Sequence, residues 1–440
     1  MGGTAADCLI FDSGTSMMNY VSNASNMPVD GGLCVYNEVS CESYHQNFTM
    51  RASDWLKVNN FLKSAGLDLL FDLNVLLRKG GNWDPSNAIE LIQFSKRNNL
   101  NLSWQLGNEP NSFQHVFNRN ISGAQLGRDF VQLRAILNDI YKNKEGLVVG
   151  PDITQPRHLS FNSLAFLEDF LEEINTSGER VIDAVTWHQY YISGKEAELK
   201  DFFDLTYYNI FAEEIKLVKN IVLENSSHKL PIWITETSDA YGGGAPNFTD
   251  RFVGGFLWLD KLGLAAYHGI QIDYWLSLLH KKLVGNRVLK AQIGIHETNN
   301  RNSANENVKK LRFYCHCAPS KLSAPNESAV TIFGMNLGLE TANIVVKGLE
   351  NAIYRDTYLL QGEYGVQSRL RDERHEYQIT TSRHLPKVHY SALAIVIVLP
   401  LGSSNRSMVL MSMIIESPHI IINPNSMVTK RPDRIGAVKK

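Results

Sequence analysis

The sequence lacks several features that would each place it in a particular class of protein. Its five cysteines among 440 residues are too few for a disulfide scaffold. Its late apolar runs, at 392–399 and 408–415, are too short to span a bilayer. Basic and acidic residues nearly balance at 43 and 45, so no overall positive field draws the chain to nucleic acid. With 44% hydrophobic and 20% charged residues, the composition is that of a soluble globular protein large enough for two domains.

A usual metal site is also missing from the sequence. Cys315, His316 and Cys317 stand too close together for a zinc site, and no second cysteine pair accompanies them. The cysteines are interpreted as core thiols or as members of one disulfide. We expect neither a metal nor an organic cofactor.

The amino terminus has no Lys or Arg before Arg51 and no apolar segment, so we expect no signal peptide there. Nine Asn-x-Ser/Thr sequons nevertheless indicate a glycoprotein of the secretory pathway. We expect that the chain starts within a longer natural protein. The sequons are Asn23, Asn47, Asn101, Asn120, Asn175, Asn225, Asn247, Asn326 and Asn405.

Apolar runs alternate with amphipathic helical stripes between residues 54 and 284. One stripe has four-three spacing, which is typical of a helix with one buried face. Regularly spaced strands with helices between them predict an α/β fold with a parallel sheet or (β/α)8 barrel. The predicted strands are 67–73, 102–106, 147–150, 181–187 and 231–235, and the stripe is Leu126, Phe130, Leu133, Leu137 and Ile140.

Beyond residue 285 the pattern changes to short strands separated by turn residues, which predicts a β-sandwich domain at 285–440. The barrel domain is predicted at 47–284. The segment 13–46, rich in Ser, Asn, Gly and Met, is predicted to be a linker or surface loop. The sandwich strands are expected at 309–317, 329–337, 343–347, 354–360, 376–381 and 391–399.

Polar side chains follow each predicted barrel strand, where barrel enzymes carry their reacting groups. Any one strand-end glutamate is more often a helix cap or an ion-pair partner. Two of these residues are glutamates: Glu109 follows Asn108, and Glu236 follows Thr235. Each comes directly after an apolar run, and the two runs are three βα units apart. An ionised side chain is costly at such a position unless it is paired or has a function. The full set is Asn74, Asn108, Glu109, Asp152, Gln155, Arg157, His188, Tyr190 and Glu236.

Two carboxylates facing each other across a cleft suit glycoside hydrolysis. One protonates the departing sugar oxygen while the other, ionised, attacks the anomeric carbon. Glycines 242–244 let backbone N–H groups approach an anion closely. A nucleotide phosphate loop is the rival interpretation, but no Gly-Lys-Ser/Thr follows. Arg157 offers a planar fork for a carboxylate or sulfate.

Several long stretches resemble the heparanase family, the endo-β-glucuronidases of heparan sulfate. The resemblance runs through most of residues 1–9 and 47–360. It is carried by Gly66-Leu-Asp-Leu-Leu70, Leu106-Gly-Asn-Glu-Pro-Asn-Ser-Phe113, Gly150-Pro-Asp-Ile-Thr-Gln-Pro-Arg157, Val185-Thr-Trp-His-Gln-Tyr-Tyr191, Glu236-Thr-Ser-Asp-Ala-Tyr-Gly-Gly-Gly-Ala-Pro246 and Asp273-Tyr-Trp-Leu-Ser-Leu-Leu279.

The resemblance implies a role for each matching residue. Glu109 matches the acid/base and Glu236 the nucleophile of a retaining mechanism. A non-catalytic heparanase-like relative lacks that nucleophile, which this chain keeps. The residues implied to bind substrate are Thr4, Asn108, Gln155, Arg157, His188, Tyr190, Lys195, Gly242 and Gly243.

The chain departs from the family pattern in three places. Residues 1–12 match the family's second barrel strand, and 268–275 pass over its eighth, so we expect a barrel without strands one and eight. The terminal cysteine that would pair with Cys317 is absent. The family's basic cluster corresponds here to the nearly uncharged segment 42–51, and Lys195 replaces an arginine, which weakens capture of a polyanion.

The predicted function is a retaining endo-β-glucuronidase acting on heparan sulfate or a related uronic-acid polysaccharide. The resemblance implies a secreted, extracellular-matrix or lysosomal protein. The alternatives are a catalytically inactive, heparanase-like glycan-binding protein and a non-functional truncated isoform.

Overall fold

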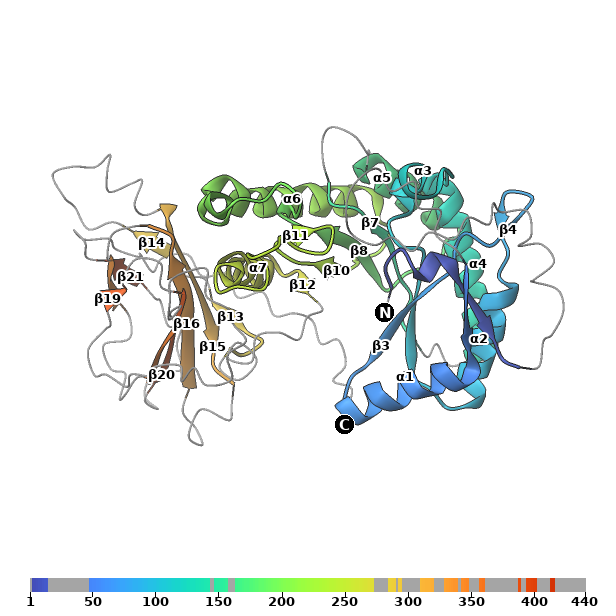
Figure 1. Cartoon of the computed structure of the whole chain (residues 1–440), viewed down its shortest axis with the longest axis horizontal. Coiled ribbons are helices and arrows are strands. Elements are labelled where there is room, and N and C mark those ends of the chain that lie inside the picture. The colour runs from blue at the N-terminus through green and yellow to red at the C-terminus, as the bar shows by residue number, and fades with distance from the viewer. Residues whose placement is uncertain are drawn as a thin grey trace. The chain divides into compact units, whose positions relative to one another are not determined.

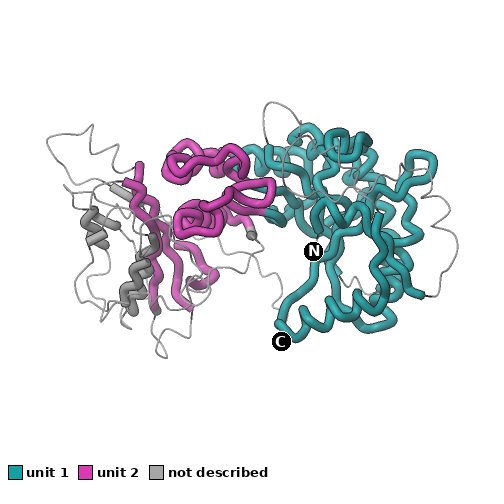
Figure 2. The backbone as a smooth tube through the Cα atoms, in the orientation of Figure 1, with its two compact units in different colours: residues 1–189, 214–236 teal, residues 190–213, 237–440 magenta. Residues whose placement is uncertain are grey.

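The chain divides into two compact units in a computed structural model (Figure 2). Unit 1 contains residues 1–189 and 214–236, and unit 2 contains 190–213 and 237–440. The structure describes residues 2–14, 47–142, 146–156, 163–272, 284–289, 292–294, 309–319, 328–338, 342–347, 356–360, 387–388, 393–401 and 412–415.

Unit 1 alternates strands and helices along the chain (Figure 1). Its last strand and α6 both run across the boundary with unit 2. The elements are η1 (Ala6–Cys8), β1 (Leu9–Asp12), β2 (Phe48–Arg51), α1 (Ala52–Ala65), β3 (Leu69–Leu73), β4 (Arg78–Lys79), β5 (Asn82–Trp83), α2 (Ser86–Arg97), β6 (Leu102–Leu106), η3 (Pro110–Ser112), α3 (Phe113–Phe117), α4 (Gly123–Tyr141), β7 (Val149–Ile153), α5 (Ser163–Asn175), β8 (Ala184–Gln189), α6 (Leu205–Asn225) and β10 (Ile232–Thr237).

The longer strands of unit 1 pair in parallel, as the βα pattern predicts, whereas the two-residue strands β4 and β5 pair antiparallel. β1 pairs with β2, β3 with β6, and β7 with β8, which has β10 on its other side. An isolated parallel bridge joins Trp104 to Val148 and so connects β6 to the segment before β7. The five strands predicted between 67 and 235 are confirmed. The strands that the structure describes do not form a closed barrel.

Helix α4 contains the apolar stripe predicted between Leu126 and Ile140. The Oγ of Ser122 caps it by accepting the backbone N–H of Gln125 at 3.1 Å. The stripe side chains are buried, apart from partly exposed Ile140. Phe130 meets Phe170 of α5 edge to face, with ring centroids 5.1 Å apart. This packing anchors both helices against the sheet that carries the polar strand ends.

A second aromatic cluster lies under α1. Trp55 meets Phe71 of β3 at 4.7 Å between ring centroids, and Phe71 meets Trp104 of β6 at 6.4 Å. The indole N–H of Trp55 donates to Ser95 at 3.0 Å, so its polar atom is satisfied in the core. Each buried aromatic stabilises the fold by about 1.5–3 kcal/mol relative to exposure, which fixes β3 and β6 as neighbours.

The described part of unit 2 contains the short helical segment η4, the beginning of α6, the helix α7 and two mainly antiparallel sheets. One sheet has the order β13-β15-β16-β20-β18 and the other β14-β21-β17-β19. The elements are β9 (Ile192–Ser193), η4 (Leu199–Phe203), β11 (Ala240–Tyr241), α7 (Gly254–His268), β12 (Gln271–Ile272), β13 (Val288–Leu289), β14 (Gln292–Gly294), β15 (Leu311–Cys317), β16 (Ser328–Asn336), β17 (Ala342–Lys347), β18 (Asp356–Leu360), β19 (Lys387–Val388), β20 (Leu393–Leu401) and β21 (Ser412–Ile415).

Five of the six strands expected beyond residue 285 are present as β15, β16, β17, β18 and β20. The sixth, at 376–381, lies outside the described residues. The sandwich and the domain boundaries at 12, 46 and 284 stay predictions. Within the described part of the chain, no helix has the length and apolar character needed to cross a membrane.

Candidate active site

The carboxyl ends of the parallel strands in unit 1 bring the predicted polar residues to one edge. Leu73 of β3 is in register with Leu106 of β6, so Asn74 and the Asn108-Glu109 turn follow at the same level. Ile153 of β7 is in register with Trp187 of β8, which places His188 next in line. Ligand-binding side chains gather at this edge in α/β proteins.

The backbone at this edge has two unusual turns. Glu109 has φ +53° and Asp152 has φ +58°, a left-handed conformation that non-glycine residues adopt rarely. The two turns are tied together because the N–H of Glu109 donates to the carbonyl of Asp152 at 3.0 Å. Such strain clusters at functional sites, where the surrounding structure holds it.

His188 lies between the carboxylates of unit 1. Its side chain is 1% exposed, and its Nδ1 lies 2.8 Å from Oε1 of Glu109. Its Nε2 lies 2.8 Å from Oδ2 of Asp152. The Oε2 of Glu236 lies 3.9 Å from the same Nδ1 that contacts Glu109. The two predicted catalytic glutamates therefore converge on one nitrogen atom.

This convergence limits how far apart the two glutamates are. The two contacting oxygens, Oε1 of Glu109 and Oε2 of Glu236, cannot be farther apart than the sum of their distances to Nδ1. This upper limit allows the spacing of about 5–5.5 Å in retaining glycosidases and overlaps only the lower end of the roughly 6.5–9.5 Å range in inverting ones. Glu109 is 28% exposed and Glu236 42%, so both reach solvent.

Asp152 is held by donors from three strands. Its Oδ2 accepts Gln105 Nε2 at 2.5 Å as well as His188, and its Oδ1 accepts the hydroxyl of Thr235. Its own N–H donates to Thr186 at 2.9 Å. Burial disfavours a charge on His188, but the charge and hydrogen bond of Asp152, then those of Glu109, outweigh it and raise the pKa of His188 well above its ordinary value.

Two further buried carboxyl groups lie beneath the site, and the sequence analysis missed both. Asp7 of η1 accepts the backbone N–H of Asn108 at 3.1 Å, and Asp72 is the last but one residue of β3. Burial raises the pKa of each well above its ordinary value, and Asp152 adds to the effect through its charge. Asp72 could have been found from the sequence, because it is an aspartate inside the otherwise apolar strand Leu69–Leu73.

The other predicted residues of unit 1 have varied surroundings. Gln155 donates to Glu214 at 3.3 Å, and the same carboxylate accepts Gln189 at 3.0 Å. Thr4 is partly exposed in the turn before η1. The side chain of Asn74 binds the backbone of Leu9 and Leu76 and so has a structural role. The side chain of Asn108 is buried, and Arg157 lies outside the described residues.

The remaining predicted residues belong to unit 2. Tyr190 meets Tyr241 edge to face at 6.4 Å between ring centroids, and Lys195 is exposed. Gly242 and Gly243 have φ +79° and +90°, a conformation that side chains strain, so this turn requires glycine.

The glycine turn is anchored by Asp239. Its Oδ1 accepts the N–H of Ala240 at 2.7 Å and the hydroxyl of Thr249 at 2.9 Å. The Thr249 hydroxyl in turn accepts the N–H of Ala245 at 2.7 Å, just beyond the glycines. These bonds close the turn and leave its glycines exposed at the surface.

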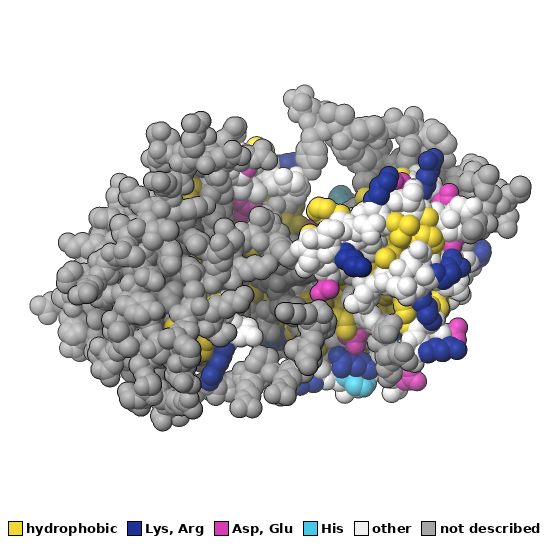
Figure 3. Space-filling view, turned by 90° about the horizontal axis from the view of Figure 1, so that it is seen from below, with side chains coloured by type: hydrophobic (Ala, Val, Ile, Leu, Met, Phe, Trp, Pro, Cys, Tyr) yellow, Lys and Arg dark blue, Asp and Glu magenta, His cyan; other side chains and the backbone are white. Residues whose placement is uncertain are grey.

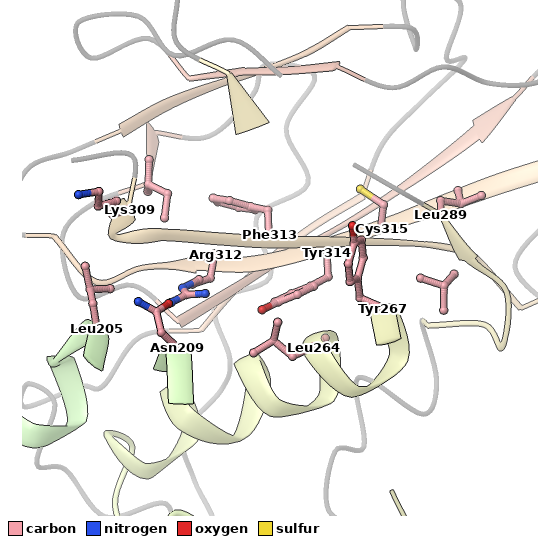
Figure 4. Close-up of a pocket in the computed structure, with 13 residues that line it drawn as sticks. Leu205, Asn209, Leu264, Tyr267, Leu289, Lys309, Arg312, Phe313, Tyr314 and Cys315 are labelled. Atoms are coloured by element: carbon pink, nitrogen blue, oxygen red, sulfur yellow. The ribbon is translucent and has the colours of Figure 1, made fainter. Parts of the chain in front are cut away.

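Unit 2 also has a pocket of about 380 Å³ between α7 and β15, lined by Tyr267, Arg312 and Tyr314 among others (Figure 4). The side chain of Cys315 lines it too, and burial raises the pKa of this thiol to about 12. Cys8, Cys315 and Cys317 are free, and Cys34 and Cys41 lie outside the described residues. Among the described residues, no three His, Cys, Asp or Glu side chains are grouped to hold a metal.

The charged surface agrees with the near balance of basic and acidic residues. On the face shown in Figure 3, Lys and Arg side chains of the described part are scattered among Asp, Glu and uncharged side chains. A polyanion would meet isolated cations there, whose attraction salt screens.

Comparisons with known proteins show the family of the chain. Residues 33–263 match the family "Glycosyl hydrolase family 79, N-terminal domain". Over 379 residues the chain is 36% identical to heparanase of Gallus gallus, covering 80% of this chain and 69% of that protein. Over 324 residues it is 38% identical to heparanase of Bos taurus, covering 67% and 56%.

The chain is also similar to a protein that is named as inactive. Inactive heparanase-2 of Mus musculus is 31% identical over 351 residues, covering 74% of this chain and 58% of that protein. Among solved structures, a Paenibacillus polymyxa xyloglucanase from glycoside hydrolase family 44 matches with a TM-score of 0.53 at 14% identity, covering 81% of this chain and 84% of that one, which supports the fold alone. The chain belongs to glycosyl hydrolase family 79, as a heparanase-like protein.

Proposed function

We propose that this protein is a retaining endo-β-glucuronidase that cleaves heparan sulfate or a related glycosaminoglycan. The observation that carries the proposal is the position of two solvent-reaching carboxylates on one histidine nitrogen, at 2.8 and 3.9 Å. Heparanases are among its relatives, which favours a uronic-acid polysaccharide as the substrate.

Glu236 is the proposed nucleophile and Glu109 the proposed acid/base. Glu236 attacks the anomeric carbon and forms a glycosyl ester, while Glu109 gives a proton to the departing sugar oxygen. Water then attacks the ester and Glu109 takes its proton. Glu109 suits proton transfer because it is the less exposed glutamate and has a direct hydrogen bond to His188.

The remaining predicted residues are proposed to bind the sugar. Asn108 would contact the 2-hydroxyl, and Arg157 and Lys195 would contact carboxylate or sulfate groups. The exposed glycine turn would offer backbone N–H groups to an anion. The proposed sugar-binding residues are Thr4, Asn108, Gln155, Arg157, His188, Tyr190, Lys195, Gly242 and Gly243.

We extend the proposal to architecture and location. A TIM-type (β/α)8 arrangement without strands one and eight, followed by a β-sandwich, is our interpretation of the parallel βα units and the two later sheets. The sequons and the relatives favour a secreted, matrix or lysosomal glycoprotein.

The test is cleavage of heparan sulfate by the purified chain, followed by size-exclusion chromatography of the products. We expect chain shortening by the parent and none by Glu236→Gln. As a matched control, Glu224→Gln removes an exposed glutamate elsewhere in unit 1 and should cleave like the parent. Equal cleavage by Glu236→Gln and the parent would refute the assignment.

A second candidate function is glycan binding without cleavage. It is favoured by the similarity to inactive heparanase-2 and by the absence of a closed barrel among the described strands. Retention on heparin-Sepharose without any shortening of heparan sulfate would support this candidate over the first.

A further inference from the structure

The contacts of Asp152 determine where the hydrogen atoms of His188 lie. An ionised carboxylate only accepts hydrogen bonds, and Asp152 accepts from Gln105, Thr235 and His188. The Nε2 of His188 must therefore carry a hydrogen. The Nδ1 is left for Glu109, whose Oε1 lies 2.8 Å away. One proton occupies the contact between Nδ1 and Oε1.

We propose that Asp152 is a positioning residue that keeps this proton available to Glu109, so that the acid/base of the reaction is a His188–Glu109 pair rather than a lone glutamate. This inference rests on the proposed function for its catalytic part. The shared proton leaves through Oε1 with the sugar oxygen. In the second half, the attacking water returns a proton to Oε1 and restores the pair.

The charges around the pair favour this assignment. Asp152 of β7 contacts Nε2 directly, and Glu236 of β10 reaches within 3.9 Å of Nδ1. Asp7 of η1 and Asp72 of β3 add further carboxyl groups whose charges interact with that of Asp152. All these neighbours are acidic, and each ionised one strengthens the hold of the pair on its proton.

The main test is the pH dependence of kcat/KM for Asp152→Asn, which keeps the side-chain shape and removes its charge. Loss of the shared proton sets the alkaline limb of activity, so this limb should move down by about one to three pH units. The acid limb of the same profile should stay in place. An alkaline limb that does not move would overturn the proposal, whatever the loss in kcat.

Two further variants separate this role from a structural one. Thr235→Val removes one hydrogen bond from Asp152 but keeps its charge, so the alkaline limb should stay or move up. Asp129→Asn removes a buried carboxylate that pairs with Arg78 at 2.9 Å. It should lower stability without moving either limb. A downward shift in Thr235→Val or Asp129→Asn equal to that in Asp152→Asn would contradict the assignment.

A measurement without substrate keeps the inference testable if the chain has no glycosidase activity or if Asp152→Asn folds poorly. Nitrogen NMR of labelled histidines, with the His188 signals identified by their loss in His188→Gln, reports protonation directly. We expect a protonated His188 in the parent and in Thr235→Val up to a pH well above the ordinary histidine range. In Asp152→Asn this limit should fall by about one to three units. A parent His188 that titrates in the ordinary range refutes the inference, whereas missing cleavage alone refutes the proposed function.

Discussion

The Nδ1 of His188 lies 2.8 Å from Oε1 of Glu109, in a contact whose histidine side is almost completely buried. The His188 side chain is buried, whereas the Glu109 side chain reaches solvent. Bound sugar would cover the exposed partner, strengthening the hydrogen bond by removing competing water. This asymmetry supports the proposed roles, proton transfer by Glu109 and direct attack by the more exposed Glu236.

Glu109→Gln should therefore affect substrates according to their leaving group. We expect a loss of about 10²–10⁴-fold in kcat for heparan sulfate, whose leaving sugar oxygen needs a proton. The loss should be much smaller for an aryl β-glucuronide with an acidic phenol as the leaving group. Steady-state kinetics on both substrates checks this, and Glu236→Gln is the control that should lose activity on both. Equal losses on both substrates for Glu109→Gln would contradict its role as the acid.

Much of unit 1 could be predicted from the sequence because its strands are apolar runs at regular intervals. Both glutamates were found since each follows such a run, where a charge is costly. The strand residues that bind Asp152 could not be found in this way. Gln105 and Thr235 lie within strands, and only the parallel register places them against Asp152. The βα cadence predicts a parallel sheet or a (β/α)8 barrel, because regular spacing does not report how a sheet closes.

Glycosylation offers a test of the proposed secretion. Asn101 and Asn247 are exposed, whereas the side-chain nitrogen of Asn175 donates to the carbonyl of Asn225 at 2.6 Å. After secretion from a eukaryotic host, we expect glycans on Asn101 and Asn247 and none on Asn175. Peptide mass spectrometry measures occupancy, with Asn101→Gln and Asn175→Gln as a matched pair. A glycan at full occupancy on Asn175 would contradict the prediction that its contact with Asn225 blocks glycosylation.

Gly263 of α7 should be intolerant of a side chain. A Cβ there would lie 2.1 Å from Cδ2 of Tyr314, whose hydroxyl donates to Asp260 at 2.6 Å. Gly263→Ala should lower the free energy of unfolding by about 1–3 kcal/mol, despite the gain of about 1 kcal/mol that alanine brings to a helix. Urea unfolding measures this. In a Tyr314→Leu background the same change should cost less, and an equal cost would exclude the ring as the obstacle.

Asp260 should make the stability of unit 2 depend on pH. Burial raises the pKa of Asp260 from its ordinary 3.8 to about 6, with Arg312 and Tyr314 opposing the rise. Between these values the folded state holds a proton that the unfolded state has released. Stability is therefore highest below the lower value and falls as pH rises through the window, by on the order of 3 kcal/mol.

Asp260→Asn has no such proton, so its stability should not show this fall. The difference in unfolding free energy between parent and variant, from urea titrations at a series of pH values, should change between about pH 4 and 6 and stay constant above that. Asp250→Asn is the matched control, because Asp250 is 63% exposed in the same unit and its charge is solvated in both states. Parent and Asp260→Asn curves that run parallel across the whole range would show that Asp260 ionises as easily in the fold as in the unfolded chain.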